Sequence, residues 1–471
     1  MSAPLKTAAS EAIAYLEGLE GMPVRATADL ADLRGRLRRP LAAEGVPAEQ
    51  VLLELVADVR GGLNASAGGR FFGWVIGSSV TAAVGADWLA AAWDQNAASY
   101  STAPAAAVVE EVVGEWLKSI LGLPPSASFA LVTGCQMAHV TCLAAARHAL
   151  LAQRGWNVET QGLFSAPAIR VISGGHRHGS IDRALRLLGI GTNQMAELPT
   201  ASDGRLDAGL LESALAASPD APTVVVLQAG DLNIGAFDSF SELIPIAKKY
   251  GAWVHVDGAF GLWAAASPRL RPRMSGASMA DSWATDGHKW LNVPYDCGYA
   301  FVADGAAHRS AMATRVNYIS YSSDVRDEGD WNPEWSRRAR GFPTYAAIRQ
   351  LGRGGIAGLV ENCCDHAHAL VTGIGRLDGA EVLFMPTLNQ GLVRFIDRRA
   401  GAGPADHDRR TDAIVEAICA GGEALFSGTM WQGRRAMRVS VCSWRTTASD
   451  VERTVSCIAR ALEEDAPGPS G

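Results

Sequence analysis

Residues 252–257 read AWVHVD and residues 281–290 read DSWATDGHKW, and these two stretches decide the fold. Each begins as a short apolar run and ends in residues that carry chemistry, a carboxylate at Asp257 and an amine at Lys289. Short apolar runs with polar residues at their ends are typical of buried strands whose ends face a ligand. They also raise the question of why a lysine stands between a histidine and a tryptophan.

Four further short apolar runs surround this pair and alternate with helical stretches. The full set is FALVT (129–133), AIRVIS (168–173), TVVVLQ (223–228), AWVHVD (252–257), DSWAT (281–285) and YAFVA (299–303). Short runs that are apolar on both faces and separated by helices indicate a mostly parallel sheet in an α/β domain.

The regions on either side of these runs differ from them in pattern. Helices with a proline-broken connection and the glycine-rich link GGLNASAGG predict an N-terminal helical arm at 1–69, before a large domain at 70–341. A long helical segment and three strand-like runs, EVLFMP, GLVRFID and AMRVSVC, predict a small α+β domain at 342–471.

The composition is ordinary for a soluble enzyme, with 471 residues, 48% hydrophobic, 19% charged and a net charge of −7. The negative charge argues against nucleic acid as a partner. No apolar run has membrane-spanning length and the start lacks an apolar signal core, so we expect a cytoplasmic protein without a membrane partner.

The eight scattered cysteines indicate reduced thiols. The cluster CCDHAH (363–368) is interpreted as a helix face, and no metal is expected.

Polar residues follow the apolar runs, at the edge where ligands collect in parallel α/β sheets. The turn TGCQMAH (133–139) opens directly into a helix, which suits a phosphate, although such junctions also carry glycine for packing alone. The segment GGHRHGS (174–180) puts histidines beside the same edge, or is a surface turn. We expect that AGDLNIG (229–235) either covers a ligand or forms an ordinary turn.

Asp257 and Lys289 give the clearest chemical indication. A carboxylate that ends an apolar strand requires a cationic or hydrogen-bonding partner, and a structural salt bridge is the alternative explanation of Asp257. Apolar neighbours disfavour the ammonium form of Lys289, which favours it as an amine nucleophile for a carbonyl, whereas a lysine that extends its head to solvent is the alternative. One ligand explains all these features, because pyridoxal phosphate needs a phosphate cradle, a face for its ring, an anion opposite its pyridine nitrogen and a lysine for its aldehyde.

A series of separated motifs extends this pattern along residues 70–460: RFFGWVIGSS (70–79), EVVGEWLKSILGLP (111–124), HGSIDRALRLLG (178–189), GAFD (235–238), HVDGAFG (255–261), DGHKWLNVPYDCG (286–298), SRRARGF (336–342) and RVSVCSWRTT (438–447). In these motifs the chain resembles the group II pyridoxal-phosphate-dependent amino acid decarboxylases, the aromatic amino acid, glutamate and histidine decarboxylase-like branch of the fold type I enzymes. The resemblance implies an aspartate aminotransferase-like fold, in which helices cover both faces of a central, mostly parallel seven-stranded sheet.

The resemblance also implies roles for individual residues. Lys289 would form the internal aldimine with pyridoxal 5'-phosphate, His178 would stack on the cofactor ring and Asp257 would pair with the pyridine nitrogen. The remaining cofactor contacts would be those of Cys135, Gln136 and His288 with the phosphate and of Ala259 with the ring.

The family is built as a homodimer with the active site at the subunit boundary, and Phe71, Phe72 and Trp74 would line the substrate end of the pocket. These aromatic residues fit an aromatic or apolar substrate. Arg315 and Arg340 would instead suit an acidic substrate, although paired surface arginines are the better explanation.

The implied reaction is the decarboxylation of an L-amino acid to its amine. Two departures from the family pattern bear on it: the phosphate turn lacks the usual serine or threonine followed by an acidic residue, and no tyrosine stands just before SRR. In segment 320–338 the only tyrosine is Tyr321, and Asp327, Glu328, Asp330 and Trp331 lie nearer the expected place of the proton donor.

Without that donor, the carbanion formed on decarboxylation partitions to transamination, to oxygen or to an aldehyde. A decarboxylating oxidase that forms an aldehyde, an aminotransferase or an aldolase on the same scaffold is therefore the alternative function. A cofactor-binding protein without activity is a further one, against which the intact lysine and aspartate argue.

Overall fold

The computed structural model describes residues 2–314 and 325–464. The chain divides into two compact units, a large unit of Ser79–Cys364 and a small unit that combines Met1–Ser78 with Asp365–Gly471. Helix α12 (Gly341–Ile374), interrupted at Gly352, runs from one unit into the other and contains the CCDHAH cluster in the helical form that the sequence predicts. The division at residues 69 and 341 stays a prediction.

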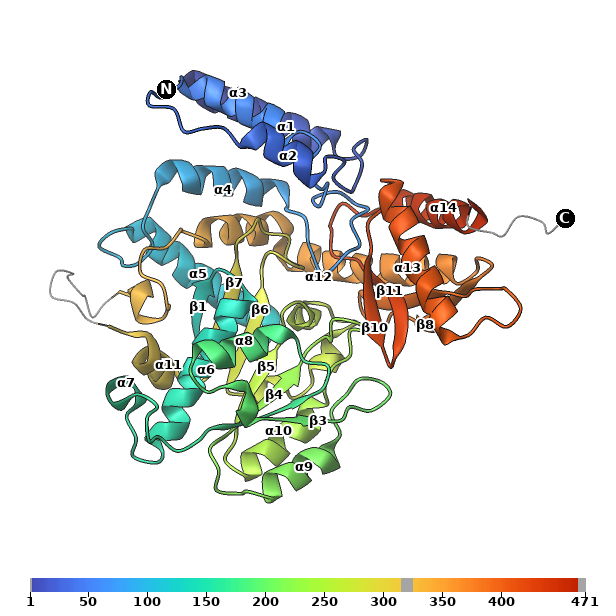
Figure 1. The fold of residues 1–471 in the computed structure, drawn as a ribbon. Coiled ribbons are helices and arrows are strands. Elements are labelled where there is room, and N and C mark those ends of the chain that lie inside the picture. The colour runs from blue at the N-terminus through green and yellow to red at the C-terminus, as the bar shows by residue number, and fades with distance from the viewer. Residues whose placement is uncertain (1, 315–324, 465–471) are drawn as a thin grey trace. The chain divides into compact units, whose positions relative to one another are not determined.

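A seven-stranded sheet forms the centre of the large unit, in the order β1-β7-β6-β5-β4-β2-β3 (Figure 1). Its strands are β1 (Ser128–Val132), β2 (Arg170–Gly174), β3 (Met195–Leu198), β4 (Thr223–Gln228), β5 (Trp253–Asp257), β6 (Ser282–Asp286) and β7 (Gly298–Val302). The strands from β3 to β6 run parallel, whereas β7 runs antiparallel to both β1 and β6. The predicted mostly parallel sheet is confirmed.

One strand of this sheet, β3, escapes the sequence pattern. It has four residues, MAEL, and lies at the sheet edge, where none of its residues is fully buried. An edge strand packs against a single neighbour and needs no continuous apolar run, so its pattern does not differ from that of a loop.

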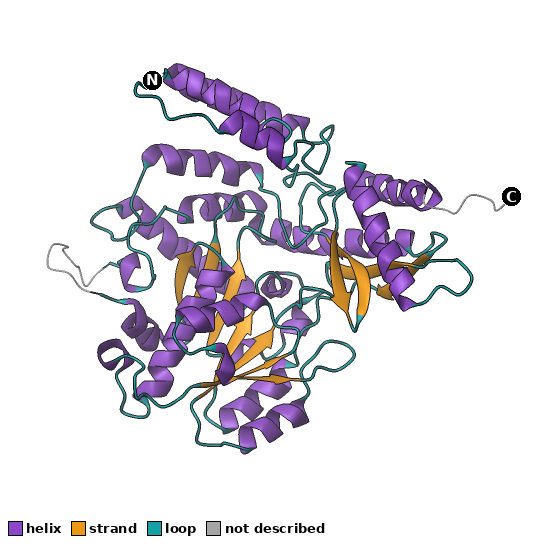
Figure 2. Ribbon diagram, in the orientation of Figure 1, coloured by secondary structure: helices purple, strands orange, loops and turns teal. Residues whose placement is uncertain are grey.

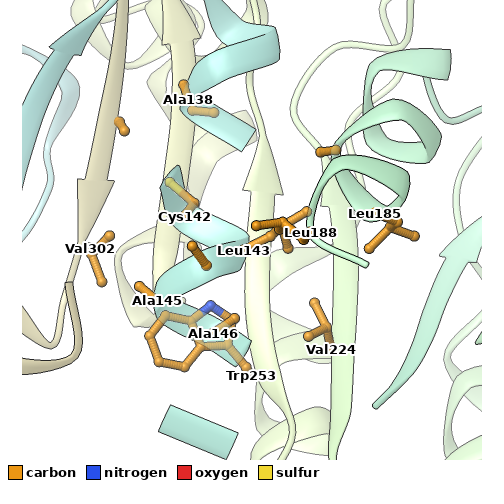
Figure 3. Close-up of a cluster of buried hydrophobic side chains, with 14 of the residues drawn as sticks. Ala138, Cys142, Leu143, Ala145, Ala146, Leu185, Leu188, Val224, Trp253 and Val302 are labelled. Atoms are coloured by element: carbon orange, nitrogen blue, oxygen red, sulfur yellow. The ribbon is translucent and has the colours of Figure 1, made fainter. Parts of the chain in front are cut away.

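Helices cover both faces of the sheet (Figure 2). The helices of the large unit are α4 (Thr81–Trp93), α5 (Pro104–Leu121), α6 (Cys135–Ala152), α7 (Val158–Gln161), α8 (Gly179–Leu187), α9 (Ala208–Ala216), α10 (Phe240–Lys249), α11 (Gly305–Met312) and the first part of α12. Helix α6 packs against strands β1, β5, β6 and β7, and its small residues Ala138, Ala145 and Ala146 are completely buried there (Figure 3). This close packing fixes the start of α6, directly after the turn that follows β1.

The small unit combines helices α1 (Ser2–Gly18), α2 (Leu30–Leu37) and α3 (Ala48–Val59) with an antiparallel sheet in the order β10-β11-β9-β8. The sheet strands are β8 (Ala380–Phe384), β9 (Gln390–Phe395), β10 (Ser427–Trp431) and β11 (Arg434–Ser440), followed by α14 (Ala448–Glu464), while α13 (Pro404–Ala420) lies between β9 and β10. The sequence predicts three of these strands and misses β10, whose residues SGTMW include a glycine and are partly exposed.

The segment 61–69, expected to be a flexible link, is held by specific contacts inside the small unit. Asn64 Oδ1 accepts a hydrogen bond from the backbone N–H of Ala26, and the Thr446 hydroxyl donates to the Gly69 carbonyl. Ala65 is 1% exposed. The glycines of segment 61–69 therefore belong to a packed turn.

Two further features can be followed along the described residues, namely membrane-spanning helices and the state of the cysteines. Among the described residues, no helix is both long enough and apolar enough to span a membrane. All eight cysteines are buried and none is in a disulfide, as expected for reduced thiols.

Candidate active site

The ends of β4, β5 and β6 lie side by side and bring the chemically important residues together. Gln228 pairs with Asp257 in the β4–β5 register, Asp257 pairs with Ala284 in the β5–β6 register, and β6 ends two residues later at Asp286. The turn after β1 reaches the same place because Val132 and Asp286 both pair with Gly298 at the start of β7. Residues 150 positions apart therefore meet at one edge of the sheet.

Lys289 lies three residues beyond the end of β6 and is ion-paired with Asp286, with 3.0 Å between Lys289 Nζ and Asp286 Oδ2. Burial opposes the ammonium form, but the Asp286 carboxylate outweighs it, so the pKa of Lys289 lies above its ordinary value. The expectation that the ammonium form of Lys289 is disfavoured overall is therefore wrong for this structure, because it considered the apolar neighbours and left out the carboxylate.

Asp286 also closes the turn expected to bind phosphate. Its Oδ1 accepts a hydrogen bond of 2.6 Å from the backbone N–H of Cys135, the first residue of α6. The Cys135 thiol is buried, and burial raises its pKa well above the ordinary value, so it stays protonated. The sequence motifs assign no role to Asp286, although it ends a buried strand as Asp257 does.

His288 lies beside the same carboxylate, with 3.5 Å between its Nε2 and Asp286 Oδ1. Its Nδ1 accepts a hydrogen bond from the backbone N–H of Cys297, and its ring stacks on Tyr295 with 4.3 Å between centroids. Burial lowers the pKa of His288. The backbone bond to Nδ1 leaves Nε2 directed at the Asp286 end of the site.

Asp257 is buried and held by two groups. Its Oδ1 accepts a hydrogen bond of 3.1 Å from the backbone N–H of Ala259, and its Oδ2 lies 3.6 Å from Nε2 of His139. The partner that burial of this carboxylate requires is therefore present. His139, fully buried in α6, is a second residue to which the sequence motifs assign no role. The same helix also contains His148, so a histidine in α6 is not by itself a distinguishing signal.

Gln136 and His178 connect α6 to α8 at the edge of this cluster. The Gln136 side-chain amide donates a hydrogen bond of 3.2 Å to the Ser180 carbonyl. His178 is the N-cap of α8, where its Nδ1 accepts from the Ser180 N–H, and its side chain is exposed. Both residues lie in the large unit with Lys289 and Asp257.

The predicted substrate residues Phe72 and Trp74 belong to the small unit. Phe72 is completely buried and stacks on Phe426 with 5.3 Å between ring centroids, whereas Trp74 is 52% exposed. Of the arginines considered for an acidic substrate, Arg340 is buried and paired with Asp296 at 2.8 Å, and Arg315 lies outside the described residues.

The loop before SRR carries no tyrosine among its described residues, and Tyr321 lies outside them. Its acidic residues are occupied: Asp327 accepts from the Tyr100 N–H, Glu328 pairs with Arg326 and Asp330 pairs with Arg309. All three are buried. Their contacts are those of structural residues that hold the loop, which leaves the proton donor of the family pattern without a described counterpart.

The geometry fits pyridoxal phosphate at both ends. A Cβ added to Gly298 would lie 2.5 Å from the Gly134 backbone, so the turn needs glycine there. A Cβ added to Gly134 would lie 3.0 Å from Cε1 of His288, which leaves little space for a side chain at that position. The start of α6 lies behind this turn, and the positive end of this helix suits a phosphate. The Cys135 N–H is already bonded to Asp286, and the N–H groups of Met137 and Ala138 are bonded to the Gly134 carbonyl. At the other end, the nearest partners of Asp257 are neutral, so its charge is available to a cation such as a protonated pyridine nitrogen.

Comparison with known proteins agrees with this geometry. The family described as "Pyridoxal-dependent decarboxylase conserved domain" matches residues 37–396. An aromatic-L-amino-acid decarboxylase of Bacillus atrophaeus is 26% identical over 460 residues, which cover 96% of this chain and 93% of the relative. A 4-hydroxyphenylacetaldehyde synthase of Rhodiola rosea is 25% identical, with 96% and 92% covered.

Among solved structures, Oryza sativa TDC with PLP and tryptamine superimposes with a TM-score of 0.91 at 24% identity, covering 98% of this chain and 97% of that one. This likeness shows the shared fold, which is the fold type I architecture that the sequence predicts. The family match spans most of the chain, and the chain belongs to the pyridoxal-dependent decarboxylases, enzymes that use pyridoxal phosphate to act on amino acids as carboxy-lyases.

Proposed function

We propose that this enzyme removes the α-carboxylate of an L-amino acid and releases the amine, with Lys289, Asp257 and His178 as its catalytic residues. The observation that carries this assignment is the convergence of Lys289, Asp286, Asp257 and the start of α6 at one sheet edge. Bound pyridoxal phosphate supplies an aldehyde for the amino group and a ring that accepts electrons.

The chain's own residues bind and orient the cofactor in this proposal. Lys289 would provide the amine for the aldehyde, and Asp257 would hold a proton at the pyridine nitrogen. His178 and Ala259 would contact the ring. The phosphate contacts come from Cys135, Gln136 and His288, which surround the start of α6.

Borohydride reduction of the holoenzyme followed by peptide mapping tests the position of the lysine. The cofactor should be found on the peptide that contains Lys289, and Lys289→Ala should lose both the label and the visible absorbance of the bound cofactor. Lys249→Ala is the matched control, because Lys249 is an exposed lysine paired with Glu212 at 2.7 Å. Label on any other lysine would refute the assignment.

An aromatic or apolar amino acid is the substrate class we propose. The relative from Bacillus atrophaeus is named for aromatic amino acids, and Phe72 and Trp74 remain our candidates for the pocket that receives the side chain. The pairing of Arg340 with Asp296 argues against an acidic substrate bound there.

Oxidative decarboxylation to an aldehyde is the second candidate. The occupied acidic residues before SRR favour it, because the part of this loop that the structure describes offers the carbanion no obvious proton donor, and one relative is named as an aldehyde synthase. In that reaction the amino acid, oxygen and water give the aldehyde, carbon dioxide, ammonia and hydrogen peroxide. Measuring amine and peroxide together across the common amino acids separates the two, since amine without peroxide indicates simple decarboxylation.

A homodimer in the cytoplasm completes the proposal. The eight buried cysteines, none of them in a disulfide, support a reducing compartment. Exposed apolar side chains on α4, namely Trp88, Leu89 and Trp93, support a covered face between two copies of the chain. Light scattering of the holoenzyme should give twice the chain mass, and the mass of one chain would contradict this part.

A further inference from the structure

A chain of buried polar groups extends from Asp257 into the core of the large unit. His139 Nδ1 and His255 Nε2 are 2.9 Å apart, and His255 Nδ1 is 2.9 Å from the Ser282 hydroxyl. The Trp253 indole N–H donates to the same hydroxyl at 2.9 Å. His139, His255 and Ser282 are each 0% exposed. They come from α6, β5 and β6. We call these three residues the relay, and it joins a helix to two central strands.

The direction of the hydrogen bonds follows from what lies at the two ends. Trp253 can only donate, so the Ser282 hydroxyl accepts from it. The same hydroxyl can either donate to His255 Nδ1 or accept from it, and the charge at the Asp257 end selects the order in which it donates. His255 Nε2–H then donates to His139 Nδ1, which leaves the proton of His139 on Nε2. That N–H faces the Asp257 carboxylate at 3.6 Å, whereas the opposite order would put a lone pair against the negative charge.

Burial keeps both imidazoles neutral. It lowers the pKa of His139 to about 3 and that of His255 to about 3. The relay therefore presents an N–H dipole to Asp257 and no positive charge, so the carboxylate keeps its charge for a cation that comes from outside the chain.

His139 also contacts the other end of the site, with 3.5 Å between its Nε2 and the Cys135 sulfur. Cys135 begins α6 at the phosphate turn, and Asp257 ends β5 at the proposed pyridine end. One side chain thus touches both ends of the predicted cofactor site.

We propose that His139 is a positioning residue for the reaction: its Nε2–H orients the Asp257 carboxylate toward the cofactor's pyridine nitrogen, and His255 and Ser282 hold its ring in place. The inference rests on the proposed role of Asp257. It predicts a change in the bound cofactor that a merely structural histidine would not cause.

The same atoms also have metal-ligand chemistry, which is the competing explanation. Donor atoms of Cys135, His139 and Asp257 lie within 4.8 Å of one another. A metal there would require a thiolate, but burial keeps this thiol protonated, and Lys289 places an ammonium nearby that repels a cation. Elemental analysis of the holoenzyme decides the point, because a stoichiometric metal lost together with His139 would overturn the relay.

The main test compares His139→Leu with His139→Gln, which retains a side-chain N–H donor. In His139→Leu we expect the bound cofactor's visible spectrum to shift, and cofactor affinity and kcat to fall about tenfold each, the loss expected for one polar contact to a carboxylate. KM should change little, and His139→Gln should recover most of the loss. The matched control is His308→Gln, because His308 is equally buried and bonded to Ser128 and Trp331, away from Asp257.

Two outcomes of this test have separate meanings. If Asp257→Ala changes the cofactor spectrum and His139→Leu does not, the relay is refuted while the proposed function stands. If neither variant changes it, the role of Asp257 itself is refuted. Ser282→Ala covers the case in which His139→Leu fails to fold, since it removes only the far end of the relay; an unchanged spectrum in that variant would equally overturn the proposal.

Discussion

The ends of strands β5 and β6 carry two buried aspartates with opposite electrostatic surroundings. Asp286 faces the Lys289 ammonium at 3.0 Å and the first N–H of α6 at 2.6 Å, so the chain itself neutralises its charge. Asp257 faces a backbone N–H and a neutral imidazole. Two identical side chains at equivalent strand ends are therefore prepared for different tasks, one to hold a lysine and a helix start, the other to receive a cation.

The largest effect should come from removing the carboxylate that awaits a cation. Asp257→Ala should lower kcat on the order of a thousandfold, because the ring loses the negative group that keeps its nitrogen protonated. Asp257→Glu, which keeps the charge, should recover part of the activity. Steady-state kinetics with the cofactor at saturation measures this. A loss confined to cofactor affinity, with kcat intact, would mean that Asp257 only binds the cofactor.

The second aspartate should act on the lysine. Asp286→Asn removes the charge that raises the pKa of Lys289, so the free amine should form at lower pH. The apoenzyme should then capture pyridoxal about tenfold faster near neutral pH, the equivalent of one pKa unit. Pyridoxal without its phosphate is the suitable probe, because it separates the effect on the lysine from any effect on phosphate binding.

The control for this variant is Asp281→Asn, which breaks the more exposed contact between Asp281 and Lys248. It should leave the pH dependence of pyridoxal capture where it is in the parent. If Asp286→Asn moves that dependence to higher pH, or both variants move it alike, the ion pair is not what sets the state of Lys289.

The sequence identifies one of these two aspartates and not the other for a physical reason. Asp257 ends a mostly apolar run, whereas Asp286 is followed at once by glycine, histidine and lysine, which direct attention to the lysine. Strand ends and apolar runs are local features, and they predict the sheet and the place of the site. The contact of Asp286 with Cys135 joins residues 151 positions apart, and His139 meets His255 across 116 positions, so neither can be inferred from a local pattern.

Acid gives the smallest expected effect, and it acts through the buried histidines His139 and His255 on the Asp257 side of the site. Burial lowers the pKa values of His139 and His255 to about 3, from an ordinary 6.5 that both regain on unfolding. The unfolded chain therefore binds more protons between pH 6.5 and 3, and the stability that neutral histidines contribute is complete above pH 6.5 and lost as the pH falls. At pH 5.5 each should cost about 1.4 kcal/mol of unfolding free energy.

Urea unfolding at pH 7.5 and pH 5.5, at one protein concentration, measures this loss. His139→Gln should reduce the difference between the two pH values by about 1.4 kcal/mol. His308→Gln should reduce it by the same amount, because burial lowers the pKa of His308 to about 3 as well. Only the first variant should also alter the bound cofactor, which separates the relay's part in positioning Asp257 from the general cost of burying a histidine. Equal pH sensitivity in the parent and both variants would mean that these imidazoles take up protons in the folded protein.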